Sequence, residues 1–215
     1  MKKRRYSRQR SLKDLSRREG GQTPRAKILI VCEGEKTEPV YFRSLCRELR
    51  LSTVEVEICG KECGSAPISV VNYTIERRQK QQQVELAFDE AWSVFDVDKH
   101  SSLSAALDKA ASNRLRIALS NPCFEYWILL HFEDTDRSFL NPDKLISYLR
   151  NYHPDYKKGV DCVRTIMPQL EVALIRARNF EKNRLPNTGV NKKNSSTDVH
   201  LLVERLREIA AKPYA

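Results

Sequence analysis

The sequence lacks long hydrophobic runs: no stretch approaches the roughly 18 consecutive apolar residues that a membrane-spanning helix needs, so no membrane span is expected. The charged amino terminus is not followed by an apolar segment, which argues against a secretory signal peptide and predicts a cytoplasmic protein. The six cysteines lack the second closely spaced pair of a four-ligand zinc site, and we expect them to be reduced. A glycine-rich loop ending in Lys-Ser or Lys-Thr is also absent, so the sequence carries no ATPase signature of its own.

Acidic residues are scarce at the beginning of the chain. Residues 2–27 contain 11 Lys and Arg residues against Asp14 and Glu19, so most of the net charge of +10 lies there. We predict that residues 1–25 form a basic disordered tail. Such a tail, including Arg4 and Arg5, can bind a nucleic-acid backbone by releasing counterions, or it can be a solubilising extension. The two interpretations are compatible.

The rest of the chain begins with alternating strands and helices. A continuous apolar run at 27–32 is typical of a central parallel strand, whereas 54–58 alternates apolar and charged residues, as an edge strand does. Further strands are expected at 92–98 and 114–120. Strands that alternate with helices predict an α/β fold of the Rossmann-like kind, with a mostly parallel sheet flanked by helices.

From residue 121 onward the pattern becomes mainly helical. We therefore expect a single domain at 26–211, in which an α/β core at 26–120 is followed by a helical extension at 121–211. The apolar faces of the helices in that extension could supply the surface of a homodimer.

Acidic residues follow two of the predicted strands. Glu33 comes directly after the first strand, and Asp96 and Asp98 end the strand at 92–98. Because strand side chains alternate, the two aspartates point to the same side, and the carboxyl ends of parallel strands meet at one edge of a sheet. Oxygen-only ligands suit Mg²⁺ or Mn²⁺. The alternative for an isolated Asp-x-Asp is that it caps a turn or helix; the second acidic strand end favours a metal site.

Four segments together resemble RloB-like proteins. They are IVCEGEKTEPVYF at 30–42, FDVD at 95–98, SNPCFEYW at 120–127, and His200 at the start of the last helix. The Glu-Gly after one strand and the Asp-x-Asp after another are also similar to the Toprim fold of topoisomerases, primases and overcoming-lysogenization-defect nucleases. The resemblance implies a Toprim-like fold, a nuclease role in bacterial anti-phage defence or restriction, and a separately encoded ATPase partner.

The resemblance also implies roles for individual residues. It assigns Glu33 to the Toprim glutamate and Asp96 and Asp98 to its aspartate pair, and it relates Glu38 and Glu125 to further acidic positions, with altered spacing. All five are then candidate ligands of Mg²⁺ or Mn²⁺, in one or two metal sites. Two ions would stabilise the attacking and leaving oxygens of a phosphodiester cleavage. Glu33 is alternatively the general base that activates water.

Phosphodiester cleavage also needs positive side chains near the phosphate. Lys99 follows the aspartates directly and is our first choice as a catalytic residue. Lys36 and Arg116 are expected near the same strand edge, where they would contact the nucleic acid.

Two other functions are compatible with the sequence. One is a non-catalytic subunit with a degenerate Toprim site that binds nucleic acid or a partner through its basic tail. The other is a topoisomerase-type transesterase, which ranks last because it requires a tyrosine nucleophile from another domain. The sequence does not distinguish DNA, RNA or tRNA as the substrate.

Overall fold

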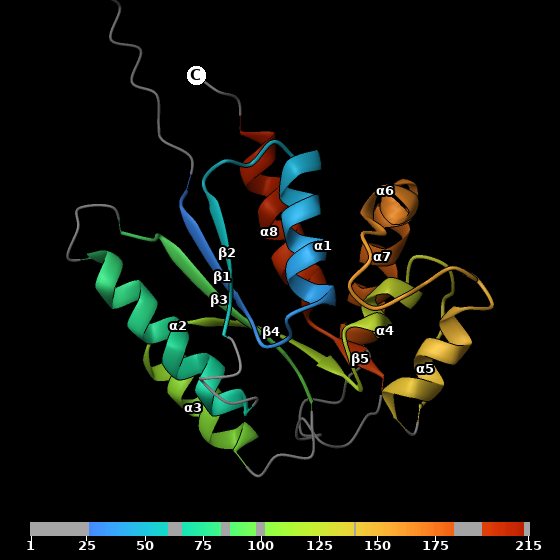
Figure 1. The fold of residues 1–215 in the computed structure, drawn as a ribbon, viewed down its shortest axis with the longest axis horizontal. Helices are drawn as coiled ribbons and strands as arrows, with labels where there is room; N and C mark the ends of the chain where they lie inside the picture. Colours follow the sequence, from blue (N-terminus) through green and yellow to red (C-terminus); the bar gives the residue numbers. More distant parts are fainter. Residues whose placement is uncertain are drawn as a thin grey trace, which may run out of the picture.

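Five strands form one sheet, in the order β2-β1-β3-β4-β5 (Figure 1). The computed structural model describes residues 26–59, 66–82, 87–97, 102–139, 141–182 and 195–212. The strands are β1 (Ile28–Cys32), β2 (Val54–Ile58), β3 (Glu90–Asp96), β4 (Arg116–Asn121) and β5 (Ser196–Thr197). The first four are parallel, and β5 runs antiparallel to β4. The predicted α/β class with a mostly parallel sheet is confirmed.

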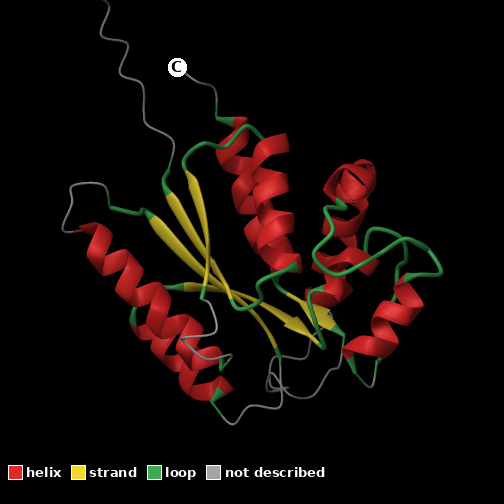
Figure 2. Cartoon of the chain, viewed as in Figure 1, coloured by secondary structure: helices red, strands yellow, loops and turns green. Residues whose placement is uncertain are grey.

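Helices cover both faces of the sheet (Figure 2). In chain order they are α1 (Thr37–Glu48), α2 (Pro67–Gln82), α3 (Leu103–Ser112), α4 (Glu125–Leu129), α5 (Pro142–Leu149), α6 (Val163–Ile166), the 3-10 turn η3 (Met167–Gln169), α7 (Leu170–Lys182) and α8 (Val199–Ala211). Helices α2 and α3 lie on one face and α1 and α8 on the other (Figure 1). Within the described ranges, no helix is both long and apolar enough to cross a membrane.

The uninterrupted apolar sequence of β1 agrees with helices on both faces of the sheet. Ile28 and Ile30 belong to the core formed with α1 and α8, whereas Leu29 and Val31 belong to the core formed with α2 and α3. Since both faces of the strand are buried, it has no solvated face that would require polar residues. The hydrophobic effect of burying the whole run holds β1 within the sheet, and the strand ends at Cys32, directly before Glu33.

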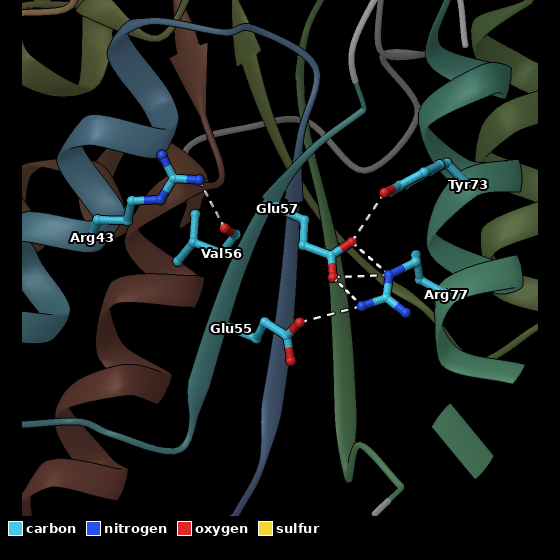
Figure 3. A network of polar contacts seen from close by, with 6 residues as sticks. All are labelled: Arg43, Glu55, Val56, Glu57, Tyr73 and Arg77. Carbon is cyan, nitrogen blue, oxygen red and sulfur yellow. Dashed lines mark hydrogen bonds and ion pairs between the residues drawn. The ribbon is translucent and has the colours of Figure 1, made fainter. Parts of the chain in front are cut away.

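Arginines from both faces secure the edge strand β2 (Figure 3). From α2, Arg77 donates to both carboxylate oxygens of Glu57, with Nε 2.7 Å from Oε2, and to Glu55 at 3.2 Å. Tyr73 donates to Glu57 at 3.1 Å. From α1, Arg43 donates to the carbonyl oxygen of Val56 at 3.0 Å. The prediction of an edge strand with one polar face is confirmed, and that face is occupied by an ion-pair network.

The fifth strand comes from the extension that was expected to be mainly helical. Ser196 and Thr197 pair with Asn121 and Ser120, and the Ser120 and Thr197 hydroxyls lie 3.0 Å apart. The carbonyl of Ser120 in turn accepts from Val97 at 2.7 Å. This short strand therefore braces β4 beside the end of β3, where the acidic residues lie.

Candidate functional site

The acidic side chains from different strands and helices converge on one pocket. Glu33 follows β1, Asp96 ends β3, Glu38 lies in the first turn of α1, and Glu125 opens α4. The pocket has a volume of about 330 Å³, and its lining consists of Glu33, Gly34, Glu35, Lys36, Thr37, Glu38, Asp96, Glu125 and Lys158. Residues that are up to 125 positions apart thus meet at the carboxyl edge of the parallel sheet, where this class of fold binds ligands.

Backbone pairing between β1 and β3 positions the first two carboxylates. Cys32 lies opposite Val94, and the backbone N–H of Glu33 donates to the carbonyl of Val94 at 2.9 Å, which extends the strand pairing by one residue. The backbone N–H of Asp96 donates to Oε2 of Glu33 at 3.3 Å. The Glu33 carboxylate is therefore held against the end of the neighbouring strand, as predicted.

Gly34 provides the space for the third carboxylate. A Cβ atom at this position would lie 2.6 Å from Oε2 and 2.9 Å from Oε1 of Glu38, so any side chain here would displace the Glu38 carboxylate. The backbone of Gly34 lies outside the left-handed region, so the glycine matters here for the space that it leaves to Glu38 and not for its conformation. The turn after β1 therefore lets Glu38 fold back toward the pocket.

Glu125 is buried and has three partners on one oxygen. It is 1% exposed, and Oε1 accepts from the hydroxyl of Tyr156 at 3.0 Å and from that of Thr37 at 3.3 Å. The ammonium group of Lys158 lies 3.8 Å from the same oxygen. These contacts satisfy the buried carboxylate and fix its orientation toward the pocket.

Negative charge dominates the electrostatics of this pocket. Burial raises the pKa of Asp96 well above its usual range, and the nearby charges of Glu38, Glu125 and Glu33 raise it further. Burial and the charge of Glu125 likewise raise the pKa of Glu38. Burial alone would lower the pKa of Lys158, but the surrounding negative charges, of which Glu125 is the largest, raise it overall. The pocket is thus a site where a further cation would be stabilised.

The donors fit Mg²⁺ or Mn²⁺ in their chemistry, because carboxylate oxygens are the ligands that these ions prefer. In the part of the chain that the structure describes, however, no group of three or more His, Cys, Asp or Glu side chains is arranged to hold a metal ion. Asp98, the second aspartate of the predicted pair, lies outside the described residues. A complete ligand set therefore requires that residue or a rotation of the side chains that are described.

The other predicted site residues have different outcomes. Lys36 lines the pocket, as expected. Arg116 does not lie near the carboxyl edge: it is the first residue of β4, at the opposite end of the strand, and its guanidinium is 3.6 Å from Glu90 and 5.4 Å from the ring centroid of Trp92. That expectation was wrong because Arg116 begins β4, and the carboxyl edge of the sheet lies at the other end of this strand. Lys99, together with Arg4 and Arg5, lies outside the described residues.

Sequence reasoning missed Tyr156 and Lys158. Both belong to the segment between α5 and α6, and they reach Glu125 across 31 and 33 positions of the chain. This segment has the composition of an ordinary polar loop, and it contains no motif that indicates a functional site. Only the packing of the extension against the α/β core brings it to the pocket.

The fold and the pocket define an α/β protein with a carboxylate site at the carboxyl ends of parallel strands. The family model described as RloB-like protein matches residues 28–206, which include every residue that lines the pocket. The chain therefore belongs to the RloB-like family, as the sequence motifs predicted. Comparison with curated proteins and with solved structures gave no match.

Proposed function

We propose that this protein is a metal-dependent nuclease that hydrolyses phosphodiester bonds of a nucleic acid in the bacterial cytoplasm, as part of anti-phage defence and together with a separately encoded ATPase. The observation that supports this proposal is the convergence of Glu33, Glu38, Asp96 and Glu125 on one pocket. Carboxylates that raise each other's pKa are costly for the fold, and a divalent cation bound between them would offset that cost.

Each described side chain has a role in this proposal. Glu33 and Asp96 would hold a divalent ion together with Asp98, while Glu38 and Glu125 would complete the ligand set. Bound Mg²⁺ or Mn²⁺ would supply Lewis-acid stabilisation of charge on the phosphoryl oxygens. Glu33 is also our candidate for the general base that takes a proton from the attacking water. Lys36 lies at the pocket, where its positive charge can bind the phosphate backbone.

The test is a cleavage assay with end-labelled RNA and DNA, in Mn²⁺ and in EDTA. We expect cleavage only with the metal, and a loss of about two to three orders of magnitude in the double variant Asp96→Asn, Asp98→Asn, the size of effect seen when a stabilising group is removed from an active site. The matched control is Glu57→Gln, which removes a carboxylate from β2 outside the pocket and should leave cleavage unchanged. Equal cleavage by the double variant and the natural protein would contradict the proposal.

A second candidate is a non-catalytic subunit that binds nucleic acid or a partner. It is favoured by the absence, among the described residues, of a group arranged to hold a metal ion. The same assay separates the two functions when retention of the labelled nucleic acid is measured alongside cleavage. Binding that weakens steeply with salt, without cleavage in any condition, would support the second candidate.

A further inference from the structure

We infer that Lys158 is the internal counter-cation of the acidic pocket: its ammonium group neutralises Glu125 while no divalent ion is bound and withdraws when an ion binds. The inference rests on the proposed function, because it concerns how the pocket exchanges one cation for another.

The two members of the Lys158–Glu125 pair differ in their freedom to move. The side chain of Glu125 is 2% exposed and that of Lys158 is 47% exposed, and their charged atoms are 3.8 Å apart. Hydroxyls of Thr37 and Tyr156 fix the same carboxylate oxygen. The lysine has a long flexible side chain and solvent beside it, so it can leave this contact at little cost, whereas the glutamate cannot.

The segment on the amino-terminal side of Lys158 is held in place by hydrogen bonds of Tyr156. The Tyr156 hydroxyl donates to Glu125 at 3.0 Å, and Arg150 donates to the carbonyl of Tyr156 at 3.3 Å. The position of Lys158 beside the pocket is therefore set by packing on its amino-terminal side.

The segment after Lys158 is anchored as well. Gly159 has a φ of +80°, and a Cβ there would lie 3.1 Å from the Cβ of Lys36, so the segment lies directly against the turn that follows β1. Asp161 accepts from Ser44 at 2.6 Å and from Arg47 at 3.2 Å, both on α1. Because both flanks are held, exchange of the cation requires rotation of the lysine side chain and no movement of the loop.

The positive charge of Lys158 determines how the exchange affects metal binding. The ammonium group acts on Asp96 and Glu38 as well as on Glu125, and in each case it offsets the repulsion between carboxylates. A divalent ion entering the pocket would be repelled by that same ammonium group. Lys158 should therefore stabilise the metal-free protein and weaken metal binding.

The experiment compares the full-length natural protein with three variants. Lys158→Gln removes the charge, Lys158→Arg retains it, and Lys157→Gln makes the same change at the preceding, exposed residue of the same loop. Mn²⁺ affinity is measured by electron paramagnetic resonance of the free ion, without substrate, and thermal unfolding is followed in EDTA.

We expect Lys158→Gln to bind Mn²⁺ on the order of three- to tenfold more tightly than the natural protein, the effect of removing one nearby charge from a partly exposed site. In EDTA the same variant should unfold about 2–4 °C lower. Lys158→Arg and Lys157→Gln should resemble the natural protein in both measurements.

Three outcomes would overturn the inference. Unchanged or weaker Mn²⁺ binding by Lys158→Gln, while the natural protein binds Mn²⁺, would refute the counter-cation role and leave the proposed function in place. If Lys157→Gln tightens Mn²⁺ binding by the same factor, the change reflects general surface charge and not the position of Lys158. If none of the proteins binds Mn²⁺, both the inference and the proposed metal-dependent function are wrong.

Discussion

Two groups of acidic side chains in this molecule look alike in the sequence and differ in their surroundings. Glu55 and Glu57 alternate with apolar residues along β2, and Asp96 and Asp98 have the same spacing at the end of β3. In β2, strand geometry directs the two carboxylates to one side of the sheet, and the same spacing was the basis for predicting a pair at Asp96 and Asp98. Spacing alone therefore does not distinguish a structural pair of carboxylates from a functional one.

The carboxylates of β2 are neutralised within the fold. Burial acts to raise the pKa of Glu57, but hydrogen bonds from Arg77 outweigh it and the pKa lies below its usual range (Figure 3). Arg77 reaches both glutamates, and Tyr73 provides a further donor. Arg77 thus pairs with both carboxylates, while burial and the neighbouring Glu57 raise the pKa of Glu55.

The carboxylates of the pocket are not neutralised in this way. The pKa of Asp96 and that of Glu38 are raised by burial and by neighbouring acids, and Lys158 offsets the repulsion only in part. To distinguish a structural acidic cluster from a functional one, we therefore ask whether the fold supplies an arginine that pairs with its carboxylates. Where it does not, an external cation is the expected partner.

The largest effect that this comparison predicts comes from disturbing the pocket without changing its charge. In Gly34→Ala, the new methyl group would lie 2.6 Å from Glu38 and would displace its carboxylate. We expect cleavage to fall by about 100-fold, the cost of misplacing a catalytic group by roughly an ångström. Initial rates with labelled nucleic acid in Mn²⁺ measure this effect. Melting close to that of the natural protein would show that the fold survives, and cleavage at the natural rate would show that the Glu38 position is irrelevant.

The next prediction concerns the carboxylates of β2. Arg77→Ala removes the cation of β2 and leaves Glu57, whose side chain is 16% exposed, without its main donor. We expect a loss of about 1–2 kcal/mol of unfolding free energy, and no loss of cleavage, because a partly buried carboxylate is left unpaired. Urea denaturation followed by circular dichroism measures it.

The control for Arg77→Ala is Lys80→Ala on the same helix. It breaks an exposed ion pair with Glu76, in which both side chains are at least 60% exposed, and should cost less than about 0.5 kcal/mol. Equal losses in the two variants would mean that the β2 network is no more than an ordinary surface ion pair.

Much of the fold follows from patterns that depend on local geometry. The uninterrupted apolar run of β1 required a strand buried on both faces, and the alternation in β2 required an edge. Because carboxyl ends of neighbouring parallel strands share an edge, the meeting of Glu33 with Asp96 could also be predicted.

The remaining features depend on tertiary packing that leaves no periodic signal. Lys158 and Tyr156 reach the pocket only because the segment after α5 folds back onto α1 through Asp161. β5 has two residues, which is too short for any alternation to show. Arg116 was misplaced although its strand was predicted, because a residue near the start of a parallel strand lies at the edge of the sheet opposite the carboxyl ends.

The smallest predicted effect is a dependence of stability on pH that has one sign for Asp96 and Glu38 and the opposite sign for Glu57. The raised pKa values of Asp96 and Glu38 mean that the folded protein binds protons more tightly than the unfolded chain does. Stability in EDTA should therefore decline as the pH rises from about 4, the unfolded pKa of carboxyl groups, through the raised folded pKa. Glu57, whose pKa is lowered, instead loses its contribution as the pH falls through its folded pKa.

Melting temperatures between pH 4 and pH 8 in EDTA provide the measurement. Asp96→Asn should remove part of the decline toward high pH and melt about 2–4 °C above the natural protein at pH 8, because one repelling carboxylate is gone. Glu57→Gln should leave that decline intact and lower the melting temperature at neutral pH. Saturating Mn²⁺ should flatten the decline in the natural protein and in Glu57→Gln, whose pocket is intact, since in our proposal the ion replaces the protons that the pocket would otherwise bind. Parallel pH curves for both variants would show that the two carboxylate groups do not differ in how the fold neutralises them.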